Sequence, residues 1–333
     1  MFEIALIGAG RIGKIHAANI AANPRLSLSR VVDPFGGAEE LASRYGATVS
    51  TAEDVWADPA ISGVLVASAT DTHLNYTLEA IRAGKQVFCE KPLDQDAGRA
   101  AQVQQAVAAT DRHVLLGFNR RFDPSFARLQ RRLKQGEIGT LETLHIISHD
   151  PAPPPASYIP GSGGIFKDMS IHDLDMASWL LGEEIESVFA SGAVLIDPEI
   201  GAAGDFDTAK ILLRTVGGRI CVISNSRRSG YGYDQRIEAF GSKGMIRAEN
   251  KLESSVQTWT EEGARSDCFQ NFFLDRYAEA FAMEIEHFAD IIEGKATAVV
   301  NEDDGLKALI LAEAADQSAR SGSMVTLAAS ARR

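Results

Sequence analysis

The sequence has 333 residues, and at roughly 150 residues per domain this length favours two domains over a single compact unit. Hydrophobic residues make up 45% and charged residues 23%, which excludes collagen-like, disordered and disulfide-rich chains and indicates a folded globular protein. The net charge of −12 repels phosphate backbones and anionic lipids, so we expect no nucleic-acid partner and no association with membranes.

The first part of the sequence alternates short apolar runs with helical segments. We expect strands at 3–7, 26–32, 62–67, 86–89 and 113–117, and helices after the first glycine turn and over 38–45, 72–83 and 94–109. Strands that alternate with helices of this length form a parallel sheet covered by helices on both faces. The sequence therefore predicts an α/β domain with a doubly wound, Rossmann-type sheet over residues 1–120.

Beyond residue 120 the strands follow one another without helices between them. We expect strands at 141–148, 188–195, 208–213, 219–224, 235–240 and 255–259, and helices at 168–181, 272–293 and 304–319. Successive strands with alternating polar residues are typical of an antiparallel sheet with one exposed face. Residues 121–333 are therefore predicted to form an α+β domain with a large, mainly antiparallel sheet, helices covering its other face.

A glycine-rich turn follows the first predicted strand. The segment GAGRIG at 8–13 fits G-x-G-x-x-G, in which Gly8 permits the tight turn, Gly10 lets the backbone approach a pyrophosphate and Gly13 allows close helix packing. Asp33 ends the second strand about 20 residues later, where an acid hydrogen-bonds the adenosine ribose of a bound dinucleotide. Alternatively, the segment is a glycine turn without a ligand and Asp33 is an incidental surface acid. That alternative does not explain why strand, turn, helix and acid follow one another in this order.

The residues around Asp33 bear on the choice of cofactor. A carboxylate accepts hydrogen bonds from ribose hydroxyls but repels the 2′-phosphate of NADP, and no basic residue follows in 34–37. NAD is therefore the expected cofactor, although Arg30 on the strand leaves use of NADP open. The predicted cofactor-binding residues of this region are Gly8, Gly10, Arg11, Ile12, Gly13 and Asp33.

Lys91 follows the predicted strand 86–89, between Glu90 and Pro92. In open α/β sheets ligands bind outside the carboxyl ends of the strands, which is where this lysine lies. Pro92 keeps Lys91 out of the helical region and so holds it at the strand exit. A lysine in this position is either a ligand-binding cation or a solvated charge.

Five motifs together resemble one family. They are GAGRIG at 8–13, TDTH at 70–73, CEKPL at 89–93, GFNRRFDP at 117–124 and GGIFKDMSIHDLD at 163–175. In order and spacing the chain resembles the family of glucose-fructose oxidoreductase, inositol dehydrogenase and rhizopine-catabolism proteins. Within that family, SHDPAPPPASYI at 148–159 and YGYDQRIEAFGSKG at 231–244 are most similar to bacterial myo-inositol 2-dehydrogenases.

The resemblance implies an activity and an assembly. It implies NAD-dependent oxidation of the axial hydroxyl of myo-inositol to give scyllo-inosose, by a homotetramer joined through the sheets of the second domain. It also implies substrate contacts by Asn119, Arg120, Asp150 and Tyr233, and cofactor contacts by Thr70, His73, Glu90 and Lys91. Other interpretations are a surface pair for Arg120 and Arg121, and packing within the sheet for Tyr233.

Asp168 and His172 are spaced i, i+4 at the start of a predicted helix, so their side chains share one face. Oxidation of a secondary alcohol removes a proton from oxygen while a hydride leaves carbon, and an imidazole has a pKa suited to taking that proton. His172 is therefore the candidate base, Asp168 orients the ring or accepts its proton, and Lys91 hydrogen-bonds the developing alkoxide. The resemblance implies the same three roles. Alternatively, Asp168 and Ser170 cap the helix and His172 is a packed residue.

Two departures from the family pattern concern the substrate. His149 stands where the family suggests an arginine, and Pro160-Gly161 makes the following loop richer in glycine; both border the expected sugar site. Another inositol or an aldose is therefore an alternative substrate. Two further alternatives are a glycoside hydrolase that retains its NAD and a dinucleotide sensor without a working base, although the three candidate catalytic residues argue against a sensor.

We expect no metal site. Asp173 and Asp175 beside His172, or His145 with His149, offer ligand types, but hydride transfer to nicotinamide needs no metal. The three cysteines are far apart without a CxxC pair, so we expect them to pack as free thiols. No apolar run approaches the about 20 residues of a membrane span and no signal peptide is evident, so we expect a cytoplasmic protein.

Overall fold

The structure, a computed structural model, describes residues 1–328, and the chain divides into two compact units. Unit 1 comprises Met1–Phe122 and Glu279–Leu309, and unit 2 comprises Asp123–Ala278 and the chain from Ile310 onward. The predicted division, 1–120 and 121–333, assigned Glu279–Leu309 to the second part, whereas this segment packs within unit 1. The end of that division, at residue 333, lies outside the described residues.

The sheet of unit 1 is a six-stranded parallel sheet. Its strands are β1 (Phe2–Ile7), β2 (Leu26–Val32), β3 (Thr48–Val49), β4 (Ile61–Val66), β5 (Gln86–Cys89) and β6 (Val114–Leu116). Their order is β3-β2-β1-β4-β5-β6, and every pair is parallel. This is the strand order of a dinucleotide-binding Rossmann fold, so the prediction of a doubly wound parallel sheet is confirmed.

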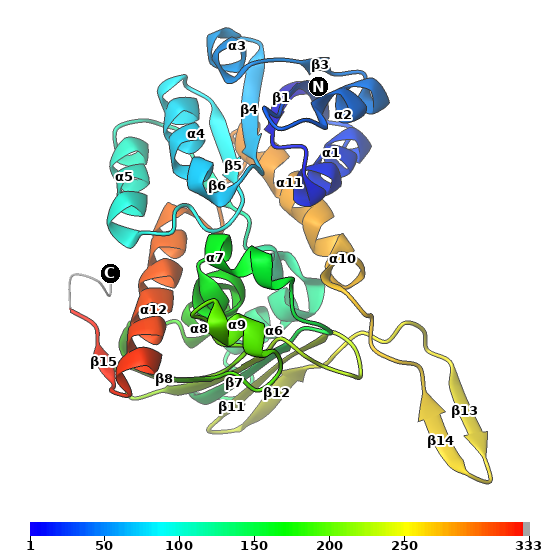
Figure 1. The fold of residues 1–333 in the computed structure, drawn as a ribbon, viewed down its shortest axis with the longest axis vertical. Helices are drawn as coiled ribbons and strands as arrows, with labels where there is room; N and C mark the ends of the chain where they lie inside the picture. Colours follow the sequence, from blue (N-terminus) through cyan, green and yellow to red (C-terminus); the bar gives the residue numbers. More distant parts are fainter. Residues whose placement is uncertain (329–333) are drawn as a thin grey trace. The chain divides into compact units, whose positions relative to one another are not determined.

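Helices cover both faces of this sheet. Those between the strands are α1 (Arg11–Ala22), α2 (Ala38–Tyr45), α3 (Ala52–Ala57), α4 (Thr70–Arg82) and α5 (Ala97–Ala108). Figure 1 shows α4 and α5 on one side of the sheet and α1 on the other. Strands β1, β4 and β5 are almost fully buried, as expected for a sheet covered on both faces.

The predicted helix 272–293 is two helices, α10 (Phe273–Arg276) and α11 (Ala278–Ile292). We expected it to cover the second sheet, but from Glu279 the chain packs in unit 1, so that expectation is wrong for α11. The Phe288 ring lies 5.9 Å from that of Phe88 on β5. A Cβ at Gly63 on β4 would lie 2.9 Å from Phe288, which shows how closely α11 packs on this sheet.

Unit 2 contains a seven-stranded sheet. Its strands are β7 (Leu141–His149), β8 (Ile185–Ala193), β9 (Thr208–Thr215), β10 (Ile220–Ser226), β11 (Asp234–Gly241), β12 (Gly244–Ala248) and β15 (Val325–Thr326). The order is β12-β11-β7-β10-β9-β8-β15, with β10 and β7 parallel and the other neighbours antiparallel. The prediction of a large, mainly antiparallel sheet is confirmed.

The two faces of this sheet differ. Helix α8 (Ile171–Leu181) packs against β7 and β10, and Ser318 on α12 (Glu302–Ser321) accepts the Ala190 N–H of β8 at 2.9 Å. The opposite face, which we call the open face, carries exposed apolar side chains: Phe189, Leu212, Ile220, Phe240 and Met245. One buried and one exposed face explain the alternating pattern seen in the sequence.

One predicted strand, 255–259, does not belong to this sheet. Strands β13 (Gln257–Thr260) and β14 (Gly263–Ser266) form a separate hairpin, which projects from unit 2 in Figure 1. Every residue of both strands is exposed, including the large side chain of Trp259. The other helical segments of unit 2 are short apart from α6 (Pro124–Lys134), and in residues 1–328 no helix combines the length and apolar character needed to cross a bilayer.

Candidate active site

The glycine turn between β1 and α1 has the shape that a dinucleotide requires. Gly8 has a φ of 101°, and a Cβ there would lie 2.4 Å from the Ala67 carbonyl oxygen. A Cβ at Gly13 would lie 2.0 Å from the Gly8 oxygen, so both positions require glycine. A Cβ at Gly10, the N-cap of α1, would meet nothing within 4 Å, and the first helical turn has no acidic residue. A pyrophosphate can therefore approach the helix N-terminus here.

Asp33 is held beside this turn by two main-chain donors. Its Oδ2 accepts the Ala9 N–H at 2.6 Å, and its Oδ1 accepts the Phe35 N–H at 2.8 Å. A carboxylate oxygen has two lone-pair sites, so each oxygen can also accept from a ribose hydroxyl. Arg30, which we considered for a 2′-phosphate, instead donates to Asp58 at 2.9 Å. The residues around this turn thus fit NAD.

Lys91 is half-buried where the chain leaves β5. The carboxylate of Glu90 lies between two partners, His16 Nε2 at 2.7 Å and the Lys91 main-chain N–H at 3.3 Å. His16 itself is buried on α1 and packs against the Phe88 ring. Glu90 therefore fixes the backbone of Lys91 to the helix that follows the glycine turn, a role the sequence did not predict; its contact with the cofactor stays a prediction.

His73 supports the same segment. Its ring is buried on α4, with Nδ1 2.8 Å from the Pro92 oxygen and Nε2 3.1 Å from the Ser68 oxygen. Burial lowers the pKa of His73, so the neutral ring has one N–H to donate. His73 thereby ties α4 to the Lys91-Pro92 turn. Thr70 begins α4 and is half-buried; contacts of Thr70 and His73 with nicotinamide stay predictions.

Asn119 and Arg120 lie in the 3-10 segment η1 (Asn119–Phe122) directly after β6. Both side chains are buried. Arg121 is also buried and pairs with Asp304 at 2.9 Å. The alternative of a solvated Arg120–Arg121 surface pair is therefore wrong, and the substrate contacts of Asn119 and Arg120 stay predictions.

Asp168 and His172 lie on consecutive helical segments of unit 2. Asp168 belongs to the π-helical segment η3 (Phe166–Ser170), and His172 lies in the first turn of α8; both are half-buried. Neither segment has a side-chain cap, and the Ser170 hydroxyl donates instead to Asn225 Oδ1 at 2.7 Å. The capping alternative is therefore wrong. Single π turns within helices are frequent at functional sites.

Two residues that the sequence did not single out contact Asp168. The Tyr158 hydroxyl donates to Asp168 Oδ1 at 3.0 Å, and Arg227 Nη1 lies 3.3 Å from Oδ2. Tyr158 comes from η2 (Ala156–Tyr158), and Arg227 follows β10. Only the inclusion of Tyr158 in the motif at 148–159 pointed to the first of them; nothing in the sequence pointed to Arg227.

The remaining predicted substrate residues lie at strand ends of unit 2. The Asp150 N–H donates to the Ser226 carbonyl at 2.9 Å, which continues the β7–β10 pairing, and its side chain is half-buried. Tyr233 is buried, with its ring 6.1 Å from that of Tyr277. This packing agrees with the structural interpretation of Tyr233, and substrate contact by Asp150 and Tyr233 stays a prediction.

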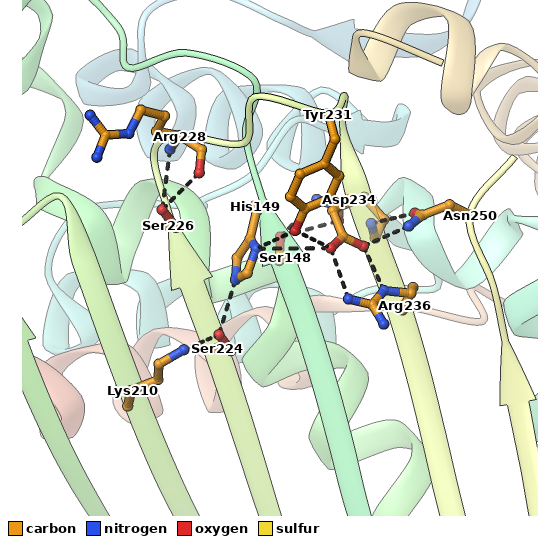
Figure 2. Close-up of polar contacts among 11 residues, drawn as sticks. Ser148, His149, Lys210, Ser224, Ser226, Arg228, Tyr231, Asp234, Arg236 and Asn250 are labelled. Carbon is orange, nitrogen blue, oxygen red and sulfur yellow. Dashed lines mark hydrogen bonds and ion pairs between the residues drawn. The ribbon is translucent and has the colours of Figure 1, made fainter. Parts of the chain in front are cut away.

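His149 belongs to a polar network on the open face, drawn in Figure 2. Its Nε2 lies 3.0 Å from Ser224 Oγ, and its Nδ1 lies 3.5 Å from the Tyr231 hydroxyl. Tyr231 and Arg236 both donate to Asp234, and burial lowers the pKa of His149. Because helix α8 lies on the opposite face, the expectation that His149 borders the sugar site gains no support. Within residues 1–328, no group of three or more His, Cys, Asp or Glu side chains is arranged to hold a metal ion.

Comparisons with known proteins cover nearly the whole chain. Residues 2–118 match a family model described as "Oxidoreductase family, NAD-binding Rossmann fold", and residues 126–247 match one described as "GFO/IDH/MocA C-terminal domain". An inositol 2-dehydrogenase of Rhizobium meliloti (strain 1021) is 46% identical over 97% of this chain and 98% of its own.

Two further relatives give the same picture. A myo-inositol 2-dehydrogenase of Thermotoga maritima is 43% identical over 95% of this chain and 96% of its own. A crystal structure of scyllo-inositol dehydrogenase from Lactobacillus casei, with bound cofactor NAD(H) and scyllo-inositol, is 30% identical with a TM-score of 0.91; the match covers 98% of this chain and 99% of that chain. The likeness therefore extends through both units.

Proposed function

Because the chain belongs to the GFO/IDH/MocA family of NAD-binding oxidoreductases, we propose that it oxidises myo-inositol with NAD to scyllo-inosose (2-keto-myo-inositol). The observation that carries this proposal is the likeness, over nearly the full length of both chains, to inositol 2-dehydrogenases of two bacteria. The NAD-shaped glycine turn with its oriented Asp33 supports it.

The chain's own residues bind the cofactor and move a proton. The backbone at Gly10 and the first turn of α1 hold the pyrophosphate, and Asp33 accepts from the ribose hydroxyls. Bound NAD supplies the hydride acceptor. His172 takes the proton of the reacting hydroxyl at a ring nitrogen, Asp168 orients that ring, and the Lys91 ammonium stabilises the negative charge that develops on the substrate oxygen.

Recognition of the polyol needs fixed hydrogen-bonding groups. A site built to bond each hydroxyl discriminates against isomers, because a wrong isomer leaves buried groups of the protein unpaired. We assign this role to Asn119, Arg120, Asp150 and Tyr233. The relative that binds scyllo-inositol favours one second candidate, oxidation of another inositol isomer.

Steady-state oxidation of myo-inositol, scyllo-inositol and D-glucose, each with NAD and with NADP, tests the proposal through absorbance of the reduced cofactor. We expect the highest kcat/KM with myo-inositol and NAD. A higher value with D-glucose contradicts the assignment. So does release of a free sugar from a glycoside without net NADH, which is the behaviour of a hydrolase that retains NAD.

Variants at the candidate catalytic residues complete this test. Lys91→Ala and His172→Asn should each lower kcat by at least about 100-fold, the usual contribution of a positioned acid or base. NADH binding, followed by fluorescence, should persist. Undiminished turnover by either variant contradicts the proposed proton chemistry.

The assembly and location belong to the same proposal. The exposed apolar side chains of the open face support a homo-oligomer, which the family resemblance suggests is a tetramer. A cytoplasmic location stays a prediction.

A further inference from the structure

Arg227 is a buried cation placed between two carboxylates of unit 2. Its side chain is 2% exposed, with Nη1 3.3 Å from Asp168 Oδ2 and Nη2 3.7 Å from Asp205 Oδ2. A buried guanidinium is costly unless negative charge compensates it, so these carboxylates are what makes Arg227 tolerable at this position. Burial of the Arg227 side chain therefore depends on the negative charge of Asp168.

Asp205, the second partner of Arg227, fixes the start of the segment that carries Asp168. Both of its oxygens lie 3.0 Å from the Ile165 N–H, directly before η3. A Cβ at Gly164 would lie 2.7 Å from Asp205 Oδ1, so a larger residue at Gly164 would displace this contact. Arg227 thus bridges the start of η3 to the carboxylate within it.

The same strand end holds the residues that follow Asp168. Asn225, two residues before Arg227, accepts from the Ser170 hydroxyl at 2.7 Å and donates to Asp173 Oδ2 at 2.7 Å. Asn225 is fully buried. The end of β10 therefore holds this helical stretch at three points, 168, 170 and 173, of which only the first involves a candidate catalytic residue.

The two oxygens of Asp168 have different neighbours. Oδ1 accepts from the exposed Tyr158 hydroxyl, and Oδ2 faces the buried guanidinium. Contacts to both oxygens fix the plane of a carboxylate, and the planar, permanently charged guanidinium is better suited than an ammonium to bridge two acids. Of these two contacts, only that of Arg227 comes from a side chain with no freedom to move into solvent.

We propose that Arg227 is a positioning residue of the dehydrogenase reaction, which acts through Asp168 by balancing its charge and fixing its plane so that it can orient the base His172. This inference rests on the proposed function. It makes a specific demand: the contribution of Arg227 to turnover must vanish when the Asp168 carboxylate is absent.

A double-mutant cycle tests that demand. It compares the wild type, Arg227→Met, Asp168→Asn and the double variant, with Arg228→Met, at the exposed neighbouring arginine, as the matched control. We expect Arg227→Met to lower kcat by about 10- to 100-fold, corresponding to loss of one charge-assisted contact, with NADH affinity unchanged. The double variant should match Asp168→Asn within about twofold, and Arg227→Lys should recover part of the loss.

Losses that multiply in the double variant overturn the proposal, because Arg227 would then act independently of Asp168. A kcat for Arg227→Met equal to that of Arg228→Met overturns it as well. If Arg227→Met does not fold, judged by NADH binding and circular dichroism, Arg227→Lys takes its place in the cycle under the same criteria.

Failure of the proposed function is recognised separately. A folded, NADH-binding wild type that oxidises none of the three polyols contradicts the proposed function. The thermal midpoints of the same four proteins then decide the pairing of Arg227 with Asp168. Decreases in the thermal midpoint that are non-additive support the pairing, and additive decreases contradict it.

Discussion

Glu284 on α11 is a fully buried carboxyl group, and neither of its oxygens has a hydrogen-bond partner within residues 1–328. Burial, and after it the nearby Glu90 carboxylate, raises the pKa of Glu284 well above its usual value of 4.5. The Glu90 carboxylate also lies 2.7 Å from Nε2 of His16. The folded protein therefore retains a proton on Glu284 that the unfolded chain releases near its ordinary pKa.

This difference makes stability depend on pH. Above the unfolded pKa the folded state binds more protons than the unfolded state, so the free energy of unfolding falls as pH rises toward the folded pKa. Glu284→Gln removes this dependence, and at pH 8 we expect it to be more stable than the wild type by about 1–3 kcal/mol, with little advantage near pH 5. Urea unfolding at several pH values measures both. Glu261→Gln, at an exposed site, is the control; equal pH slopes for wild type and Glu284→Gln contradict the prediction.

The sequence predicted those site residues whose role follows from local backbone geometry. Gly8 and Gly13 are required by close approaches within one turn, and the position of Asp33 follows from the strand that precedes it. Arg227 was missed because it reaches Asp168 from 59 residues away in sequence. Tyr158 is only 10 residues away, and it was missed because its contact depends on how the intervening loop folds. Nothing in a linear pattern indicates which remote side chains meet.

Elements with clear periodicity were predicted most accurately. Strands β2 and β5 and helix α2 have the bounds expected from the sequence. Turn residues bound the two apolar strands, and Gly37 and Gly46 bound the amphipathic helix. Helix α6 was not predicted, although Asp123 at its N-cap and Pro124 in its first turn are ordinary helix-start signals. The strand at 255–259 was assigned to the wrong sheet because β-propensity does not specify a partner.

The N-cap of α6 is also tied to α10 by a buried ion pair. Asp123 accepts from the Ser125 and Phe126 N–H groups and from the guanidinium of Arg276. Arg276 is 1% exposed and lies over the rings of Phe126 and Tyr277. The ion pair between Asp123 and Arg276 therefore joins α6 and α10, which are remote in sequence. It fixes the chain at the start of α6 and at the end of α10.

Loss of this cation should be severe. Arg276→Met leaves a buried, partly uncompensated carboxylate at Asp123, and we expect it to lower the free energy of unfolding by about 3–5 kcal/mol. The measurement is chemical denaturation followed by fluorescence. Arg265→Met removes an exposed pair with Glu262 on the hairpin and should change stability by less than about 0.5 kcal/mol. A similar small change for Arg276→Met contradicts the interpretation.

For the whole molecule, the sequence predicted the two sheet types but not the path of the chain. The sequence changes from strands that alternate with helices to strands that follow one another, and this change placed the predicted boundary near residue 120. The first segment of unit 1 ends close to that position, at Phe122. The return of Glu279–Leu309 to unit 1 could not be predicted, because the amphipathic helix α11 has an apolar face that either sheet could bury. Only the folded structure shows which sheet buries apolar side chains of α11 such as Phe288.

The open face of the unit 2 sheet bears on the assembly. Leu212 is 44% exposed, and its register partners on the neighbouring strands are Phe189 and Val222. Neighbouring apolar side chains that stay partly exposed on a sheet are typical of an interface, since removing apolar surface from water is favourable by about 25 cal/mol per Å². A two-fold contact would bring Leu212 of two copies into the same apolar layer.

A charge in that layer should therefore disrupt the oligomer. We expect the wild type to sediment as an oligomer, a tetramer by family resemblance, and Leu212→Glu to sediment as a smaller species. Its NADH affinity should be retained because the substitution lies in unit 2, whereas the glycine turn belongs to unit 1. Val299→Glu, at an exposed apolar position of unit 1, should leave the assembly intact. A monomeric wild type, or an unchanged Leu212→Glu oligomer, would show that the open face is not the interface, and its exposed apolar side chains would then require another partner.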